Sequence, residues 1–426
     1  MKVLIITYYW PPSGGSGVQR WLKFVKYLRD FNVEPVVFTA DHPNYPILDD
    51  SLENEIPKNI EVLKVPIWEP NNFLSLFKNN KTKQSAGFLN PNPSFLGKIL
   101  QYVRANYFIP DARKFWIKPA VKYLEAYLLE HKIDVIITTG PPHSLHLIGL
   151  KLKEKLNLKW ITDFRDPWTD IDYFHQLPLT EKSKKKHIKL EQKVLQNTNA
   201  VLVVGETMKR NYQKFNQNIH IISNGFDNEV SETEIKLDSK FSITHIGLMN
   251  DDRNPIILWK ILLEICAENQ QFKEDLIIRI IGTTSNSVDE NLMQFNEKNV
   301  DKIAYLNHVE VKKQQQKSQV LLLAINNVPS ANGILTGKIF EYLQAKRPIL
   351  SIGPKNGDAA KIIENTNSGV TIDFNEEIQL KSVILELYSM YKMENLNVDS
   401  SNINQYHRKE LTRKLAKIIK SVVEES

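Results

Sequence analysis

The residues best suited to chemistry begin with a glycine-rich loop near the start of the chain. Gly14, Gly15 and Gly17 follow directly after a short apolar run and precede a helical pattern. Without Cβ atoms the backbone can approach a ligand closely, and a helix start offers unpaired N–H groups to an anion. Arg20 stands where a dinucleotide fingerprint would have its last glycine. The loop therefore predicts a phosphate- or sugar-binding turn, with a plain tight turn as the alternative.

A second group of candidate residues follows a later strand of the same half. Asp163 and Asp166 flank Arg165, and Pro167 prevents the loop from continuing as a helix. Dense charge at a strand end is typical of a ligand site, although an ion pair with Arg165 is the structural alternative. We expect Arg165 to hold one acid ionised through a bidentate pair. Together with His143, these residues are candidates to orient or deprotonate an attacking hydroxyl. Asp166 is favoured, because Asp163 ends the strand.

The second half of the chain carries a different set of polar residues. Thr336, Gly337 and Lys338 begin a predicted helix that presents Glu341 one turn later. The stretch resembles a P-loop, but it is one residue short between the glycines, and Ile339 replaces the hydroxyl that would bind Mg²⁺. Helix-start amides and an ammonium suit a pyrophosphate, and a carboxylate can accept two hydrogen bonds from a ribose diol. A solvated lysine and glutamate are the alternative.

Composition limits the classes of protein to which the chain can belong. The sequence has 426 residues, a net charge of +6 and a single cysteine, Cys266, so no intramolecular disulfide can form. One thiol fits a reducing compartment, and we expect a cytoplasmic protein. No apolar run is long enough to span a bilayer, and the first residues are typical of a buried strand rather than a signal peptide. The mild positive charge is weak evidence for nucleic-acid binding.

Metal binding is not predicted from this sequence. Asp170 and Asp172 form a D-x-D pattern, but the pattern is short and lies in a polar loop. His143 and His146 are three residues apart, with no further ligand at a suitable spacing. We expect no metal ion and no other cofactor.

Elements that could position these residues recur along the chain as short β-branched runs alternating with helical patterns. This alternation predicts an α/β fold in which parallel sheets are covered by helices on both faces. The strands expected in the first half are Val3–Thr7, Val33–Thr39, Ile60–Val65, Val135–Thr139, Lys159–Asp163 and Ala200–Val204. Those expected in the second half are Ser242–Ile246, Leu276–Ile281, Val320–Ala324, Pro348–Ile352 and Gly369–Ile372.

Two doubly wound, Rossmann-like domains follow from this pattern. We expect an N-terminal domain over 1–227 with an insertion at 68–119, a linker at 228–240, and a C-terminal domain over 241–395. The spacing of apolar residues in 396–426 predicts a helix that docks back on the body. Sheets of this kind bind ligands at the carboxyl ends of their strands, so we expect the domains to face each other across a cleft.

The insertion is unusually basic and aromatic. Residues 76–118 contain eight basic side chains and one acid, Asp111, with aromatic residues interleaved. Such a segment can lie on an anionic membrane surface, and Arg113, Lys114 and Lys118 are the expected contacts. The alternative is a helical excursion whose aromatic residues pack on the first domain.

Several motifs together resemble glycosyltransferase family 4, over nearly the whole chain. In the first half they are YYWPPSGGSGVQR, FIPDARKFW, TTGPPHSLHLIG and DFRDPW; in the second they are HIGLMNDDRNP and GKIFEYLQAKRPIL. The last two resemble the donor site of the family, which implies that Gly247 and Arg253 bind the donor beside Thr336, Gly337, Lys338 and Glu341. Gly333 stands where the family usually has a first glutamate, and Leu248 where it usually has an arginine. Lys338 is the candidate for the missing cation.

The resemblance implies a metal-independent, retaining transferase of the GT-B fold. Its donor would be a nucleotide-diphosphate sugar, and its acceptor a glycan, expected to be lipid-linked, in cell-surface polysaccharide synthesis. A peripheral position at the inner face of the cell membrane would follow. The departures from the family pattern keep two alternatives open: a catalytically inactive GT-B protein that binds a nucleotide sugar or a partner, and a GT-B nucleotide-sugar epimerase.

Overall fold

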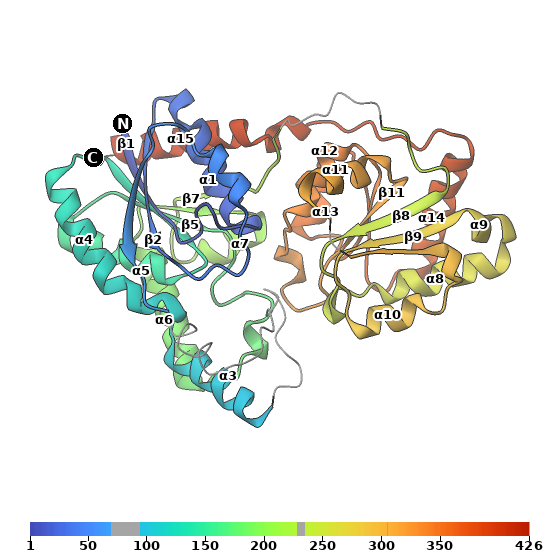
Figure 1. The fold of residues 1–426 in the computed structure, drawn as a ribbon, viewed down its shortest axis with the longest axis horizontal. Coiled ribbons are helices and arrows are strands. Elements are labelled where there is room, and N and C mark those ends of the chain that lie inside the picture. Colours follow the sequence, from blue (N-terminus) through green and yellow to red (C-terminus); the bar gives the residue numbers. More distant parts are fainter. Residues whose placement is uncertain (70–93, 228–234, 305, 426) are drawn as a thin grey trace. The chain divides into compact units, whose positions relative to one another are not determined.

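The structure is a computed structural model that describes residues 1–69, 94–227, 235–304 and 306–425. The chain forms two compact units (Figure 1). Unit 1 comprises Met1–Asn224 together with Arg408–Ser426, and unit 2 comprises Gly225–His407. Both units are parallel sheets covered by helices, which confirms the predicted doubly wound α/β class. Most of the linker expected at 228–240 lies outside the described residues.

Unit 1 is built on a parallel sheet with the strand order β3-β2-β1-β4-β5-β6-β7. Its strands are β1 Lys2–Ile6, β2 Glu34–Asp41, β3 Glu61–Pro66, β4 Val135–Gly140, β5 Trp160–Phe164, β6 Ala200–Val203 and β7 Ile219–Ile221. The order reverses between β1 and β4, and loops at such a point open outward at the carboxyl edge of a sheet. The glycine-rich loop after β1 and the His143 loop after β4 therefore lie at the switch point.

Helices cover both faces of this sheet (Figure 1). They are α1 Ser16–Leu28, α3 Phe95–Tyr107, α4 Ile117–Glu130, α5 Ser144–Leu156, α6 Glu181–Asn197, α7 Glu206–Tyr212 and α15 Arg408–Glu424. Side chains of a strand alternate between its faces, so β1 contributes Leu4 and Ile6 to one apolar cluster and Val3 and Ile5 to the other. None of the helices in the described part of the chain is long and apolar enough to cross a membrane.

The last helix returns to the first unit. Helix α15 packs against α1, and its apolar side chains Leu411, Leu415 and Ile419 are buried in the cluster formed by one face of the β1 strand. Polar contacts at its start reinforce the docking: the Arg408 Nη1 group donates to Gln19 Oε1 at 3.2 Å. The helix therefore closes a face of the sheet that the N-terminal segment alone would leave partly uncovered.

The two ends of the insertion are anchored by a buried ion pair. Arg113 Nη2 lies 3.1 Å from Glu69 Oε1, and its guanidinium stacks on the Tyr8 ring at 4.6 Å. Arg113 therefore takes part in a structural ion pair, and its expected contact with a membrane stays a prediction. Trp116 is fully buried against Phe38, whereas α3 contains no buried residue. The rest of the insertion, residues 70–93, lies outside the described part of the chain.

Unit 2 has a parallel sheet with the order β10-β9-β8-β11-β12-β13. Its strands are β8 Phe241–Ile246, β9 Leu276–Ile281, β10 Val300–Ile303, β11 Val320–Ala324, β12 Ile349–Ile352 and β13 Gly369–Ile372. Its helices are α8 Ile256–Glu268, α9 Gln270–Asp275, α10 Asn286–Leu292, α11 His308–Lys317, α12 Lys338–Ala345, α13 Asp358–Asn365 and α14 Glu377–Lys392. The short strands β7 and β10 were not predicted from the sequence, because polar residues interrupt their apolar runs.

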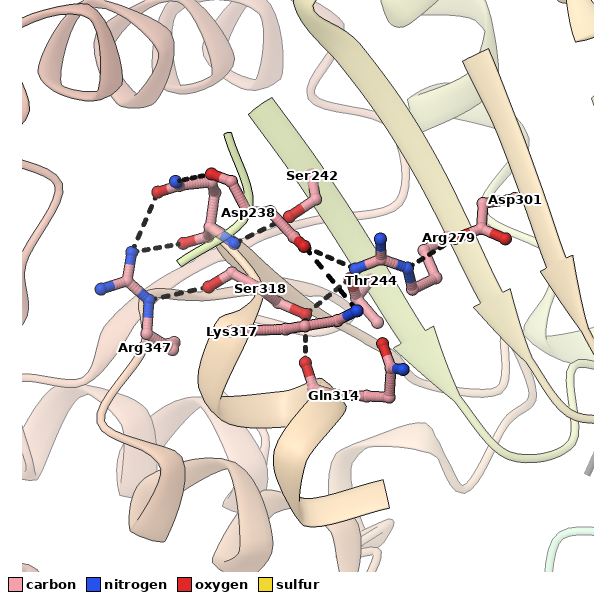
Figure 2. Close-up of polar contacts among 10 residues, drawn as sticks. Asp238, Ser242, Thr244, Arg279, Asp301, Gln314, Lys317, Ser318 and Arg347 are labelled. Atoms are coloured by element: carbon pink, nitrogen blue, oxygen red, sulfur yellow. Dashed lines mark hydrogen bonds and ion pairs between the residues drawn. The ribbon is translucent and has the colours of Figure 1, made fainter. Parts of the chain in front are cut away.

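A polar network secures the amino edge of this sheet (Figure 2). The Arg279 guanidinium bridges Asp238 and Asp301, with N–O distances of 2.5 and 2.7 Å. Beside it, Ser318 Oγ donates to Thr244 Oγ1 at 2.8 Å. The buried Arg347 donates to backbone carbonyls that include that of Ser318, at 2.8 Å. These hydrogen bonds and ion pairs satisfy polar side chains and carbonyl groups at and near the amino ends of β8, β9 and β11.

We predict that Leu415→Ala lowers the free energy of unfolding of unit 1 by about 2–5 kcal/mol, because it leaves a cavity between α15 and α1. Lys417→Ala, exposed on the same helix, should change it by no more than about 0.5 kcal/mol. Denaturant titration followed by tryptophan fluorescence measures this, since every tryptophan except Trp259 lies in unit 1. Equal stability of the two variants would show that α15 is not part of the folded core.

Candidate active site

The polar centre of unit 1 is a buried ion pair that the sequence did not predict. Arg20 on α1 donates to the Asp163 carboxylate at the end of β5, with Nη2 2.8 Å from Oδ1. Trp21 Nε1 and Thr139 Oγ1 donate to Asp163 Oδ2 at 2.8 and 2.9 Å. Burial alone would raise the pKa of Asp163, but the charge and hydrogen bonds of Arg20 outweigh it, and the pKa is lowered. Asp163 is ionised, fully buried and saturated with donors.

Arg165 does not make the bidentate ion pair that we expected. Its guanidinium donates to the backbone carbonyl of Gly17 at 2.8 Å and to that of Pro141, and it lies over the Tyr9 ring at 5.6 Å. The reason is that Arg20 already occupies Asp163 from the other side. Arg165 instead joins the loops that follow β1 and β4, and its buried Nε atom has no hydrogen-bond partner among the described residues.

Asp166 is the accessible acid of this loop. It is exposed, whereas Asp163 is completely buried. Desolvation raises the pKa of Asp166, and the charge of Arg165 counteracts this only in part. A carboxylate with a raised pKa at a strand end can accept a proton from a hydroxyl more readily than one locked in an ion pair. Asp166 is therefore the acid of this loop that a ligand could reach, and its part in any reaction stays a prediction.

His143 lies in a buried aromatic stack at the start of α5. Its ring is parallel to that of Trp168 at 4.9 Å and lies 5.7 Å from the ring of His146. Burial lowers the pKa of His143 well below its usual value and that of His146 to about 3, so both rings are neutral. Both orphan nitrogens, His143 Nδ1 and His146 Nε2, face Gly140, where an added Cβ would lie 2.9 and 2.6 Å from them. Only glycine fits at that position.

The glycines after β1 serve the fold in different ways. A Cβ on Gly14 would lie 2.8 Å from Ile47, and one on Gly17 would lie 3.3 Å from Arg165. The missing side chains at Gly14 and Gly17 therefore make room for Ile47 and Arg165 of the same unit. Gly15 has φ +83° and only one atom within 4 Å of an added Cβ, so its backbone is the accessible part of the loop. Its conformation is rare for residues with side chains.

In unit 2 a buried cation lies against the glycine that follows β8. An added Cβ on Gly247 would lie 2.7 Å from Lys338 Cε and 2.9 Å from Nζ. Lys338 is the first residue of α12, directly after its N-cap Gly337, and its Nζ atom is 3.5 Å from His245 Nε2. Burial, followed by the nearby charge of Arg253, lowers the pKa of Lys338 to about 7. His245 is neutral, because burial keeps its pKa well below the usual value.

Arg253 is held beside this lysine by contacts within its own loop. Its Nε atom donates to Asn326 Oδ1 at 2.8 Å, and Nη1 donates to the Leu248 carbonyl at 3.0 Å. Besides burial, the positive charge of Arg253 contributes to the lowered pKa of Lys338, so the two side chains interact electrostatically. The predicted convergence of Arg253 and Lys338 on a donor pyrophosphate stays a prediction. Neighbouring cations are suited to a dianionic group, and the charge of Glu341 partly offsets the lowering of the Lys338 pKa.

Glu341 faces the same end of α12 and is held by a buried amide. Gln315 on α11 is 2% exposed, and its Nε2 atom donates to Glu341 Oε2 at 3.0 Å. This bond fixes one carboxylate oxygen and leaves the other for a diol. Thr336, just before the helix, has a buried Oγ1 atom with no partner among the described residues. Gln315 was not identified from the sequence because it belongs to no motif, and nothing in the sequence singles out His245, although it opens the stretch HIGLMNDDRNP.

The described residues include no group suited to ligating a metal ion. Across the described ranges, no three or more His, Cys, Asp or Glu side chains are grouped so that they could hold a metal ion. The Asp170 carboxylate accepts a hydrogen bond from Asn211 at 3.1 Å in an exposed loop. Metal independence of any reaction remains a prediction.

Comparison with known proteins places these residues in a family context. Residues 85–230 match the family model described as Glycosyltransferase Family 4, a stretch that includes His143 and the Asp163–Asp166 loop. No curated protein sequence matches the chain.

Solved structures similar to this chain have the GT-B architecture. The trehalose-6-phosphate synthase OtsA has a TM-score of 0.61 at 10% identity, covering 100% of this chain and 99% of that one. TarM of S. aureus, solved with UDP, has a TM-score of 0.59 at 13% identity, with 98% and 99% covered. A putative UDP-N-acetylglucosamine 2-epimerase from Listeria monocytogenes has a TM-score of 0.56 at 12% identity, with 100% and 97% covered. At these identities the similarity establishes the fold.

We predict that removing the two acids of the β5 loop affects stability to very different extents. Asp163→Asn leaves Arg20 buried without a counter-charge and should lower the free energy of unfolding by about 3–5 kcal/mol. Asp166→Asn, at an exposed position, should stay within about 0.5 kcal/mol of wild type. Denaturant titration of both variants checks the assignment. Similar stability of the Asp163 variant and wild type would contradict the buried pair.

We predict a pH-dependent contribution of Lys338 to stability. Its pKa is about 7 in the folded chain and about 10.4 when unfolded. Between these values the unfolded state binds more protons, so this contribution rises with pH by at most about 1.4 kcal/mol per unit. The free energy of unfolding of Lys338→Met should therefore exceed that of wild type most at pH 6.5, and the difference should shrink toward pH 9. The control is Lys313→Met, at an exposed position; if both variants show the same pH profile, Lys338 is not desolvated.

Proposed function

We propose that this chain, which contains a Glycosyltransferase Family 4 domain within a GT-B fold, transfers a sugar from a nucleotide-diphosphate donor to a glycan acceptor. The observation that carries the proposal is the cation cluster of unit 2. A Cβ added at Gly247, where φ is +103°, would lie 2.9 Å from Lys338 Nζ, and the charge of Arg253 acts on the same lysine. Glu341 lies one turn further along the same helix. These groups suit a diphosphate and a ribose at one site.

Leaving-group stabilisation is the main chemical task of such a site. As the bond between the anomeric carbon and the diphosphate oxygen breaks, negative charge grows on the phosphates. Lys338, Arg253 and the free N–H groups at the start of α12 are fixed in advance and can offset this charge without a metal ion. Binding of the diphosphate also favours the protonated form of Lys338, whose burial otherwise penalises it.

The acceptor would be activated by unit 1. Asp166 is the accessible carboxylate there, and its raised pKa suits a proton acceptor. Asp163 is excluded from this role because all of its capacity is used by Arg20, Trp21 and Thr139. We infer attack on the same face from which the diphosphate departs, with retention at the anomeric carbon. A lipid-linked glycan of surface polysaccharide synthesis is the proposed acceptor.

Two other functions are compatible with the same fold. An epimerase is among the similar solved structures, and it would act on a nucleotide sugar without an acceptor. An inactive binding protein is the second, because Gly333 lacks the first carboxylate of the family motif. The buried Gln315 that fixes Glu341 favours a working donor site over a degenerate one.

Nucleotide release separates the three functions. A thermal-shift panel of nucleotide sugars first identifies the donor, and release of nucleoside diphosphate is then measured with and without a glycan acceptor. A transferase releases nucleotide at full rate only with acceptor, an epimerase isomerises or releases without it, and a binder does neither. Acceptor-independent turnover at the full rate would overturn the proposal.

We predict that Arg253→Ala reduces turnover by about 10²–10³, because one fixed cation of the leaving-group site is lost. Thermal melting of the variant should remain close to wild type, since Arg253 lies in a short surface loop with partial exposure. The matched control is Lys346→Ala, which removes an exposed cation at the C-terminal end of α12. This variant should keep normal turnover. Wild-type activity of the Arg253 variant would remove it from the donor site.

A further inference from the structure

We propose that Glu191 of α6 is a positioning residue, whose buried carboxylate fixes the backbone of the loop after β5. This loop comprises residues 165–172, carries Asp166 and packs against the His143 ring through Trp168. The inference rests on the proposed function, in which Asp166 activates the acceptor. It goes further by assigning a part in the transfer to a helix on which the sequence predicts no site residue.

Hydrogen-bond donors of the loop converge on the Glu191 carboxylate. Its Oε1 atom accepts from the backbone N–H groups of Trp168 and Thr169 at 3.2 and 3.3 Å, and Oε2 accepts from the Thr169 hydroxyl. The Tyr212 hydroxyl on α7 donates to Oε1 at 2.8 Å. Glu191 is 5% exposed, and burial raises its pKa although these hydrogen bonds counteract it in part. Without this carboxylate the loop backbone would lose its attachment to α6.

The same face of α6 orients the Trp168 ring. His187 lies one turn before Glu191, and its Nδ1 atom accepts from Trp168 Nε1 at 3.0 Å. Burial lowers the pKa of His187 to about 4, so the ring is neutral and Nδ1 can accept. The indole in turn lies parallel to the His143 ring at 4.9 Å. The backbone and the indole of Trp168 are therefore both held by one helix, and the plane on which His143 stacks is fixed with them.

The segment that carries Asp166 is short and held at both ends. Phe164 is fully buried at the end of β5, and Trp168 is 3% exposed. Between them, Arg165 donates through its backbone N–H to the carbonyl at the end of β4 at 3.0 Å, and the ring of Pro167 restricts φ. Asp166 therefore extends its exposed carboxylate from a backbone with little freedom, as a group that must meet a hydroxyl requires.

The contacts of Glu191 differ from those of the structural acid Asp163. Asp163 is paired with the Arg20 guanidinium, so its charge is essential. The Glu191 contacts are N–H and O–H groups, and the oxygen of a glutamine would accept the same bonds at Oε1. The glutamine Nε2 group would donate to the Thr169 hydroxyl in place of the present bond. Glu191→Gln should therefore hold the loop, whereas a shorter side chain should not.

The first test is the rate of transfer to a glycan acceptor at saturating donor. Glu191→Ala should lower kcat by about 10–100-fold, because a displacement of about 1 Å of a reacting group can cost 10²-fold in rate. Its donor affinity should stay unchanged, since the predicted donor residues lie in unit 2. Glu191→Gln should recover most of the wild-type rate. If alanine prevents folding, Glu191→Asp, one methylene shorter, should show the same loss.

The second test is hydrogen exchange of the loop amides, which needs no activity. The amides of Trp168 and Thr169 should exchange faster in Glu191→Ala than in wild type, and at the wild-type rate in Glu191→Gln. The control is Leu415→Ala, which destabilises unit 1 far along the chain and, below its melting temperature, should change neither the loop exchange nor kcat.

Two results would overturn the proposal: unchanged loop exchange in Glu191→Ala, or an equal loss of kcat in Leu415→Ala, which would reduce Glu191 to a stabilising residue. A wild-type chain without acceptor-dependent transfer would overturn the proposed function instead. The exchange of the loop amides would then still decide whether Glu191 holds the loop.

Discussion

The buried pair of Arg20 and Asp163 is the interaction on which unit 1 depends. It joins α1 to the end of β5, and Arg20 also donates to the Ile222 and Ser223 carbonyls at 2.7 and 2.8 Å, where the chain leaves the unit. Two charges taken from water need complete hydrogen bonding to be tolerated. Trp21 and Thr139 complete that set. One ionic centre therefore holds together a helix, two strands and the segment at the unit boundary.

Because Asp163 is saturated, the loop that follows it can have a different role. Arg165 turns to backbone carbonyls of neighbouring loops, and Asp166 remains exposed. The structure thus separates two acids that are only three residues apart into a structural and an accessible one. Burial keeps the His143 ring neutral, and its stack on Trp168 fixes the ring plane. The ring lies at the edge where the loops after β1, β4 and β5 meet.

Unit 2 relies on a different arrangement, a desolvated cation that forms no ion pair in the part of the chain that the structure describes. The Lys338 side chain lies where Gly247 has no side chain, so its positive charge is next to backbone that a ligand can approach. Helix α11 connects this site to the rest of the unit. Its Gln315 fixes Glu341, and its last turn accepts a hydrogen bond from Ser318 at the amino edge of the sheet (Figure 2). The Glu341 carboxylate is therefore supported from the network around Arg347.

The sequence by itself determined the α/β class, most of the strands and the motifs at their carboxyl ends, because apolar periodicity and helix-start signals are local. It placed Lys338 and Glu341 on one helix for the same reason. It could not determine that Asp163 pairs with Arg20, 143 residues away, rather than with its neighbour Arg165. Nor could it reveal that Arg113 pairs with Glu69, or that Gln315 reaches Glu341. Pairing between distant charges depends on which strands lie side by side, and only the tertiary structure decides that.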